Sequence, residues 1–450
     1  MAERFTAREA VALVADDFAP DDAPPAAQPP DGPIGWAGYD ESRTRAAGRT
    51  GSDESVHYGT ATVGGRACVL VVFEFGFLGG SLGQAAGDRL VAAYRAAAER
   101  RLPLVSLVAT GGSRMQEGMV ALTQLQRVAA AAVRLRAAGV PHVTVLRDPA
   151  TGGGWATVGA GADIVLALPS AQVAFAGSRV RPPDADPAAY TAEEQYAHGH
   201  VDAIVPPERL RETLALWLRL LTPPPGLDIL PAPAPYALGD PVPPATGWDA
   251  VRGARAADRP RAGAYLDAYF ETRAAISGDR AGGADPGVEC GFGVHEGRPV
   301  AYAAQDGGAT RPAGFRTVAR LLRLADRLGI PVLTLIDTPG AANDAEAERA
   351  GAGPAIAEAF TAIAEARTPV TSLLVGEGGS GGALALAAPG NTWAAPGGYF
   401  SVIAPELAAQ ILKRTRDQVP ETAGQLRLRP QDLVSLGVVR GVVPSAPGRA

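Results

Sequence analysis

The sequence is poor in the residues on which most enzyme chemistry relies. Only one of its 41 basic residues, Lys413, is a lysine, and the 450 residues include five histidines and two cysteines. Chemistry that requires a lysine therefore has one candidate, although a GC-rich coding bias accounts for the arginine excess as well. The cysteines, Cys68 and Cys290, lie far apart and form no CxxC pair. This excludes a disulfide framework and a zinc site built on cysteines.

Other familiar sites and segments are missing as well. The histidines form no cluster at metal-ligand spacing, and no Gly-x-Ser-x-Gly motif supports a hydrolase nucleophile. The net charge is −6 without any polybasic run, which argues against nucleic acid or an anionic membrane surface as a partner. Residues 1–10 carry charges where a signal peptide is apolar, and the apolar run 383–388 is too short to cross a membrane. We therefore expect a soluble, cytoplasmic protein.

Glycine and proline are present in excess. The 55 glycines and 39 prolines make up 94 of 450 residues, or 21%, against a usual share of about 12%. The surplus follows no Gly-X-Y period, so a collagen-like chain is excluded. With 47% hydrophobic and 20% charged residues, the chain can bury a large core. The glycines are therefore expected in turns, in helix caps and where backbones approach closely.

An internal repeat organises the chain. The segment 102–112 (Leu-Pro-Leu-Val-Ser-Leu-Val-Ala-Thr-Gly-Gly) matches 330–340 (Ile-Pro-Val-Leu-Thr-Leu-Ile-Asp-Thr-Pro-Gly) at an offset of 228 residues. The same offset places Gly153-Gly154 on Gly381-Gly382, and the block 198–206 has a later match at an offset of 238. Matching blocks in one order predict two halves of the same fold.

The repeat sets the expected domain boundaries. The Pro-dense stretch 222–246 is typical of a linker, and it separates a first domain, 34–221, from a second, 247–450. Residues 1–33 are expected to form a short N-terminal helix followed by a second linker over 19–33.

Within each half, apolar runs alternate with Gly-rich loops and helices. In the first half the expected strands and helix are strands over 68–75, 104–109 and 142–146 and a helix over 88–101. Strands that are continuous apolar runs indicate a sheet buried on both faces. The sequence therefore predicts an α/β fold with two related domains.

Each half has two glycine loops between a strand and a helix. The N–H groups that open a helix lack intrahelical partners, and glycine lets a ligand approach them because it has no Cβ. Two such loops facing each other would surround one oxygen with backbone donors and form an oxyanion hole. Tight packing alone is the alternative. The candidate loops are Gly111-Gly112 with Gly153-Gly154, and Thr338–Ala341 with Gly378–Gly382.

Charged residues beside these loops allow two interpretations. Glu377 precedes the second loop of the second half. It is either an active-site acid or a charge that closes a strand end. Arg114 and Glu117 follow the first loop of the first half. They either cap the helix or form an ion pair, or they contact a substrate.

Several motifs resemble one known enzyme family. Five motifs of the first half resemble the β subunit of the acetyl-CoA carboxylase carboxyltransferase, at 77–83, 110–118, 148–153, 175–180 and 199–205. In the second half the α subunit is resembled by Asp337-Thr-Pro-Gly-Ala341 and by the motifs at 376–385 and 399–406. The resemblance covers about residues 35 to 445. It implies a β–α fusion of two crotonase-like domains of the ββα-superhelix type.

The resemblance also implies a reaction and its site. In that family the first domain binds acyl-CoA and the second receives carboxybiotin, and CO₂ passes to the α-carbon of the thioester through an enolate. The enolate oxygen would be held by Gly111, Gly112, Gly153 and Gly154, and the biotin ureido oxygen by Gly378, Gly379, Gly381 and Gly382. Further substrate contacts are implied for Gly80, Ser113, Arg114, Gly177 and Arg179, and biotin-side contacts for Thr338, Gly340, Ala341 and Ser380.

The chain also departs from the family pattern. The four-cysteine zinc ribbon common in bacterial β subunits is absent, so we expect no zinc or other metal. The segment 181–186 is short and Pro-rich, and the loop 341–345 lacks the Tyr-Pro-Gly expected there. Lys413 is not flanked by methionines and is no biotin attachment site. Biotin is therefore expected on a separate carrier protein, with the biotin carboxylase also in another chain, and the family implies a homodimer or higher homo-oligomer.

Two alternatives to a biotin-dependent carboxyltransferase remain. The altered loop 341–345 motivates a biotin-independent decarboxylase of a malonyl-type thioester, because the same donors would stabilise the enolate left by decarboxylation. A non-catalytic subunit that binds a partner is the other. The sequence does not determine the acyl chain length or the pathway; malonyl-CoA supply for fatty acid or polyketide synthesis is the expectation that accompanies the family.

Overall fold

A computed structural model describes residues 4–21, 28–224, 226, 228–239 and 242–445 of the chain. The chain divides into two compact units, Met1–Thr222 with Arg280–Gly282, and Pro223–Asp279 with Gly283–Ala450. Parts of both expected linkers, residues 22–27, 225, 227, 240 and 241, lie outside the described residues, as do both chain ends.

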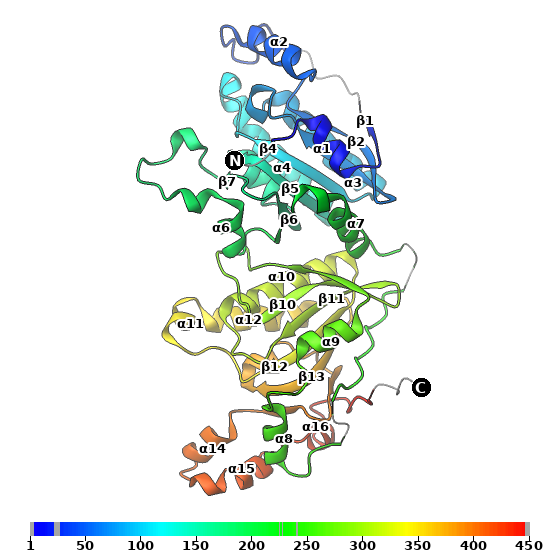
Figure 1. Ribbon diagram of the computed structural model, residues 1–450, viewed down its shortest axis with the longest axis vertical. Coiled ribbons are helices and arrows are strands. Elements are labelled where there is room, and N and C mark those ends of the chain that lie inside the picture. Colours follow the sequence, from blue (N-terminus) through cyan, green and yellow to red (C-terminus); the bar gives the residue numbers. More distant parts are fainter. Residues whose placement is uncertain (1–3, 22–27, 225, 227, 240–241, 446–450) are drawn as a thin grey trace. The chain divides into compact units, whose positions relative to one another are not determined.

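The first unit contains a mixed sheet with the strand order β1-β2-β3-β4-β5-β6-β8, and β7 pairs with β5 (Figure 1). The strands are β1 (Asp17–Pro20), β2 (Val56–Val63), β3 (Arg66–Phe73), β4 (Leu104–Thr110), β5 (His142–Thr151), β6 (Ile164–Ala167), β7 (Val173–Ala174) and β8 (Ala203–Ile204). The pairs from β3 to β6 are parallel, whereas β1, β2 and β3 are antiparallel. Every residue of β4 is buried, as expected for a central strand covered on both faces.

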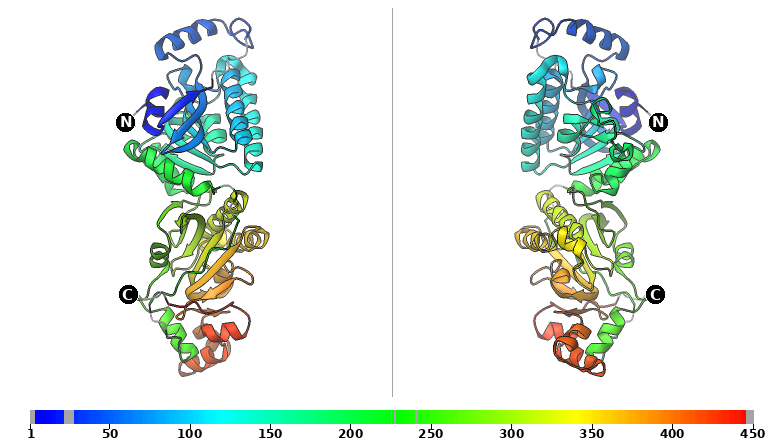
Figure 2. Two further views of the ribbon diagram at one scale, coloured as in Figure 1. Left: turned by 90° about the vertical axis from the view of Figure 1, so that its right-hand side faces the viewer. Right: turned by 90° about the vertical axis from the view of Figure 1, so that its left-hand side faces the viewer.

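Helices cover both faces of this sheet. The helices are α1 (Ala7–Val14), α2 (Tyr39–Thr50), α3 (Gln84–Arg100), α4 (Gly118–Ala137), α5 (Gly152–Gly154), α6 (Ala192–Ala197) and α7 (Leu210–Leu221). The long helices α3 and α4 pack together on one face, and α1 and α7 lie on the other (Figure 2). A π-helical turn, Trp155–Gly159, continues α5.

The second unit repeats this architecture. Its sheet has the order β14-β13-β12-β11-β10-β9, with β15 paired to β13, and the pairs from β11 to β14 are parallel. The strands are β9 (Thr272–Ile276), β10 (Val288–His295), β11 (Arg298–Gln305), β12 (Val332–Thr338), β13 (Val370–Gly379), β14 (Thr392–Ala394) and β15 (Tyr399–Ser401).

The helices of the second unit include a pair, α10 and α12, that covers one face of the sheet (Figure 2). The helices are α8 (Gly247–Ala254), α9 (Ala262–Tyr269), α10 (Pro312–Leu328), α11 (Ala345–Arg349), α12 (Ala352–Glu365), α13 (Ser380–Leu384), α14 (Pro405–Ile411), α15 (Val419–Gln425) and α16 (Pro430–Ser435). Helix α9 packs against β11 and β12, and its tyrosines join a core cluster with Leu333 and Leu335.

The internal repeat is present in the element boundaries themselves. The bounds of α3, β4 and β5 recur in α10, β12 and β13 at an offset of 228 residues, for example 104 to 332 and 151 to 379. The fold class predicted from the sequence, two related α/β domains, is therefore confirmed.

Several local expectations differ from the structure. The strand expected over 68–75 is β3 (Arg66–Phe73), which begins and ends two residues earlier. Helix α3 begins at Gln84 rather than 88, because the Gln84 N–H donates to the buried carboxylate of Glu117 and so lengthens the helix. Strand β5 continues past residue 146 to Thr151, because its last residues pair with β7. Ala19 and Pro20 were expected in a linker but belong to β1, an edge strand, where proline is tolerated.

No helix within the described parts of the chain is long and apolar enough to cross a membrane.

Candidate active site

Parallel strands bring the glycine loops to one edge of each sheet. In the first unit, β4 and β5 pair regularly up to Val108, and the register shifts before Thr110 pairs with Ala150. Both strands then lead into glycine loops that touch each other, since a Cβ on Gly152 would lie 2.9 Å from the Cα of Gly112. Gly112 has φ +105°, a conformation that favours glycine. Carboxyl ends of parallel strands are where α/β sheets bind ligands.

The first-unit donors differ in how they are engaged. The Gly112 N–H points to the Thr110 hydroxyl at 3.1 Å, and the Gly111 N–H donates to the Gly79 carbonyl at 2.8 Å. Gly153 and Gly154 lie in the first turn of α5, where an N–H has no acceptor within the helix. The structure therefore brings the Gly112 amide and the first amides of α5 together, while Gly111 ties the loop to its neighbour.

The second unit reproduces this geometry. The register between β12 and β13 shifts between Ile336 and Thr338, and the Gly340 N–H points to the Thr338 hydroxyl at 3.1 Å. Gly340 has φ +137°. The loops again touch, since a Cβ on Gly382 would lie 2.3 Å from the Ala341 nitrogen. Space beside Gly381 is open.

Gly378 and Gly379 belong to a strand rather than to the helix start. Both end β13 and pair with Phe400 and Ser401 of β15. A Cβ on Gly379 would lie 1.9 Å from the Pro339 carbonyl oxygen, so the loops could not approach with any other residue here. Ser380, by contrast, is exposed and opens α13 with φ +54°.

Arg114 lies in a buried ion-pair network. Its Nη1 is 3.0 Å from Glu54 Oε2 and 3.4 Å from Glu117 Oε1, and all three side chains are buried. Tyr39 donates to Glu117 at 2.5 Å, and Gln84 donates its N–H to the other carboxylate oxygen. Burial raises the pKa of the Glu54 carboxyl, but the Arg114 guanidinium lowers the pKa more, so the pair stays charged.

This network anchors the first donor loop. The Leu82 N–H donates to the Gly112 carbonyl at 2.8 Å, and the Arg114 N–H donates to the Leu82 carbonyl at 2.9 Å. Ser113, half-buried, lies between these two bonds. Of the two interpretations for Arg114, the ion pair describes its side chain, so the substrate contact predicted there would have to use its backbone.

The remaining acyl-side candidates lie close to the loops. Gly80 packs against the end of β4, where a Cβ would be 2.1 Å from the Ala109 carbonyl oxygen. Gly177 lies 3.8 Å, measured to its hypothetical Cβ, from the Thr151 hydroxyl. Arg179 follows it with an exposed side chain, and no hydrogen bond or ion pair holds that side chain within the described residues.

The sequence analysis named Thr338 as a biotin-side contact, but it missed Thr110, the matching residue of the first repeat, and the part that both play in orienting the loops. Thr110 and Thr338 are fully buried, and their hydroxyls accept from the glycine two positions later. A threonine two residues before a glycine in both repeats was the available signal. Arg255 and Arg259, which pair with Glu377 and Asp337 directly before the second-unit loops, belong to no motif and carry no such signal.

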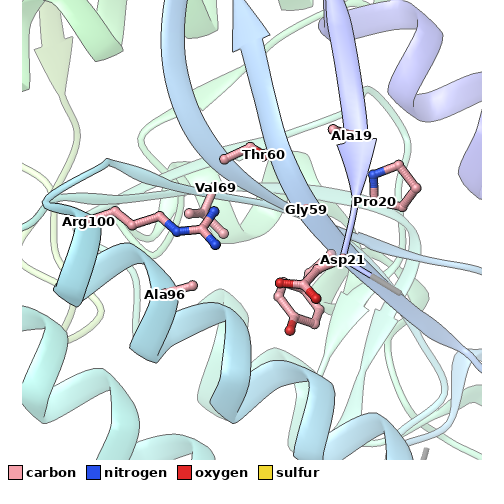
Figure 3. Close-up of a pocket in the computed structure, with 9 residues that line it drawn as sticks. Ala19, Pro20, Asp21, Gly59, Thr60, Val69, Ala96 and Arg100 are labelled. Carbon is pink, nitrogen blue, oxygen red and sulfur yellow. The ribbon is translucent and has the colours of Figure 1, made fainter. Parts of the chain in front are cut away.

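Two cavities are lined by residues that do not belong to the glycine loops. One of about 240 Å³ is bounded by β1, β2 and Arg100 at the end of α3 (Figure 3). It includes Val69, which pairs with the first residue of β4, and so lies at the opposite strand ends. A second, of about 860 Å³, is lined by Trp248, Glu406 and the lone Lys413. Within the described ranges, no cluster of three or more histidine, cysteine or acidic side chains suits a metal ion.

Comparisons with known sequences match each half of the chain to a family model. Residues 38–201 match the carboxyl transferase domain, and residues 244–450 match the family described as acetyl co-enzyme A carboxylase carboxyltransferase-like. The chain is 40% identical to the acetyl-coenzyme A carboxylase carboxyl transferase subunits beta/alpha of Salinispora arenicola, over 92% of this chain and 77% of that protein. It is 36% identical to a probable biotin-dependent acyl-coenzyme A carboxylase beta3 subunit of Mycobacterium tuberculosis, over 92% and 84%.

Solved structures share the fold. Transcarboxylase 12S, solved as a hexamer with hydrolyzed methylmalonyl-coenzyme A bound, superposes with a TM-score of 0.78 at 20% identity, covering 98% of this chain and 87% of that one. A single-chain, multi-domain long-chain acyl-CoA carboxylase gives a TM-score of 0.75 at 21% identity, covering 98% and 45%. With its two crotonase-like halves and sequence relatives of this kind, the chain belongs to the carboxyltransferase family of biotin-dependent acyl-CoA carboxylases.

Proposed function

We propose that the chain moves CO₂ from carboxybiotin to the α-carbon of an acyl thioester through an enolate. The observation that carries this proposal is the duplicated donor site: in each half, two backbone loops touch, and a buried threonine hydroxyl sits 3.1 Å from the glycine amide. One pair of donors suits each of the two oxygens that gain negative charge.

The first unit would stabilise the thioester enolate. The Gly153 and Gly154 amides open α5 beside Gly112, whose N–H would have to turn from the Thr110 hydroxyl toward the enolate oxygen. Backbone donors held in place before the reaction lower the energy of an oxyanion. Removing one such donor costs about 3–4 kcal/mol of transition-state stabilisation. Arg179, exposed beside Gly177, would meet the phosphates of coenzyme A.

The second unit would take the biotin ureido oxygen. Gly340, Ala341 and the first amides of α13 lie together, and the open space beside Gly381 leaves room for a planar ring to approach. Carboxybiotin would supply the CO₂, and the ureido nitrogen from which CO₂ departs would take the α-proton of the thioester. The chain therefore needs no side-chain base, which agrees with its shortage of histidine and lysine.

The partners follow from this assignment. Biotin would arrive on a separate carrier protein charged by a separate biotin carboxylase, and the product would be a malonyl-type thioester of the kind that fatty acid and polyketide synthesis consume. We also propose that acyl-side donors of one copy complete a site with biotin-side donors of another copy, in a homodimer or larger assembly.

Turnover of malonyl-CoA with free biotin or biocytin, in the reverse direction, tests the proposal. We expect acetyl-CoA formation that depends on biotin. The absence of biotin-dependent activity with every acyl thioester tried would overturn the proposal.

A second candidate is decarboxylation of a malonyl thioester without biotin. The loop after Ala341 favours it, because this loop turns directly into α11, capped by Asp344, where the family has Tyr-Pro-Gly. Release of CO₂ at the same rate with and without biotin would support this candidate. The retained glycine pairs argue against a non-catalytic, partner-binding subunit, and tight acyl-CoA binding measured by calorimetry would argue against it further.

A further inference from the structure

Two acidic residues stand where the biotin-side loops begin. Asp337 is the last residue but one of β12 and directly precedes Thr338, and Glu377 lies on β13 directly before Gly378. Asp337 is fully buried and Glu377 is 14% exposed. The Glu377 N–H donates to Asp337 Oδ1 at 3.0 Å, so the two loop origins are linked to each other.

Two arginines after α8 grip these two carboxylates. Arg255, the C-cap of α8, is 2.9 Å from Glu377 Oε1 through Nη2 and 2.6 Å from Glu406 through Nη1. Tyr399 donates to the same Glu377 oxygen at 2.5 Å. Arg259 Nη2 lies 2.6 Å and 2.7 Å from the two oxygens of Asp337. One short segment thus holds both strand ends from which the loops start.

Gly376, directly before Glu377, leaves room for the Arg259–Asp337 pair. A Cβ on Gly376 would lie 2.4 Å from the Arg259 Nη2 and 2.5 Å from Asp337 Oδ1. Only glycine lets the guanidinium and the carboxylate meet beside β13.

The internal repeat shows that the fold does not require the Arg255–Glu377 and Arg259–Asp337 ion pairs, which we call the clamp. At the offset of 228 residues, the first unit has Ala109 in place of Asp337 and Pro149 in place of Glu377, and neither side chain has a charge. The first unit nevertheless forms the same strands, the same register shift and the same pair of loops. The carboxylate pair is therefore not required to build this loop geometry.

We propose that Arg255 and Arg259 are positioning residues for the biotin-side half-reaction, acting through Glu377 and Asp337 on the loops 338–341 and 378–382. The proposal rests on the proposed function. The loops pack so closely that Gly379 has no room for a Cβ, so a small shift at either strand end moves the donor amides. A misplacement of about 1 Å lowers a rate by up to about a hundredfold.

The test uses Arg255→Gln and Glu377→Gln, which each remove one charge of the Arg255–Glu377 pair, together with the milder Arg255→Lys. The control is Arg252→Gln on the same helix, since Arg252 is exposed and pairs only with Asp249 among its described contacts. For each full-length variant, kcat and KM are measured for transfer between malonyl-CoA and free biotin, and malonyl-CoA affinity is measured by calorimetry.

We expect both glutamine variants to lose about ten- to hundredfold in kcat while malonyl-CoA affinity stays within about twofold. Arg255→Lys should recover part of the loss, and Arg252→Gln should match the wild type. Turnover in both glutamine variants equal to that of the control would overturn the proposal, as would an equal loss of malonyl-CoA binding.

A second measurement separates this proposal from the proposed function. If the wild type transfers nothing to biotin, the proposed function fails, and the clamp is then judged by hydrogen exchange. Amides of 376–382 should exchange at least about tenfold faster in Arg255→Gln than in Arg252→Gln. Equal exchange in the two variants would overturn the clamp.

Discussion

At the scale of single residues, the site depends on backbone groups that only glycine can present. Gly112 combines φ +105° with a contact to the opposite loop, where a Cβ would lie 3.5 Å from the Gly152 Cα. Its N–H donates a hydrogen bond to the Thr110 hydroxyl, which orients the amide. Under the proposed function, the chemistry would rely on main-chain donors, and mutations would act on it through conformation.

Gly112→Ala tests the acyl-side donor. We expect kcat to fall about 10²–10³-fold, because the added Cβ shifts the amide from the developing oxyanion. Gly65→Ala is the matched control: Gly65 has φ +74° at the β2–β3 turn and open space around it. Both variants should lose about 1–2 kcal/mol of stability in urea unfolding, the cost of a left-handed residue. Equal turnover in the two variants would contradict the assignment.

Arg179→Gln tests the exposed cation beside Gly177. We expect KM for acyl-CoA to rise about fivefold with kcat nearly unchanged, because one exposed charge contributes about 1 kcal/mol to uniform binding. Steady-state kinetics at low and high salt measure this, and the difference from the wild type should shrink as salt screens the charge. Arg209→Gln, at an exposed Arg209–Glu212 pair, is the control. An unchanged KM would remove Arg179 from the site.

At the scale of elements, buried polar side chains join the strands. His142 begins β5, is 3% exposed and lies 2.9 Å from the Ser106 hydroxyl of β4. Its ring meets Tyr94 of α3 edge-on, with centroids 5.4 Å apart. Burial lowers the pKa of His142 to about 3, with a further contribution from Arg136, so the ring is neutral in the folded protein.

This buried histidine makes stability sensitive to acid. Below pH 6.5 the unfolded chain binds a proton at His142 that the folded chain does not take up until about pH 3. From pH 6.5 toward 3, the free energy of unfolding should therefore fall by up to about 1.4 kcal/mol per pH unit more steeply than in His142→Gln. Urea unfolding at pH 7, 6 and 5 measures the two slopes, and parallel profiles would refute the prediction.

At the scale of the whole molecule, the chain is one fold used twice with different surroundings. Both units place two loops at the carboxyl edge of a parallel sheet, yet only the second has acidic residues at both strand ends. The first unit instead anchors its loop through the buried Arg114–Glu54 pair. Duplication thus supplies two pairs of glycine loops, and a different charge network lies beside each pair.

Complementation tests whether two copies share a site. Gly112→Ala damages the first unit and Gly340→Ala the second, so each variant alone should be nearly inactive. If each site combines the first unit of one copy with the second unit of another, coexpression should restore about a quarter of wild-type activity, since half of the dimers are mixed and have one intact site of two. An inactive mixture with confirmed subunit exchange would place both donor sets in one chain. Sedimentation of the wild type checks the assembly itself.

The sequence by itself determined what is local or repeated: the 228-residue repeat, the α/β class, the glycine loops and the family motifs. Each depends on neighbours along the chain, where spacing and apolar runs carry the information. Only the tertiary structure decided how the loops are held, because Arg114 meets Glu54, and Arg259 meets Asp337, across 60 and 78 residues of sequence. Burial and charge pairing arise from such distant contacts. The sequence alone therefore does not distinguish an arginine exposed to solvent from one in a buried ion pair.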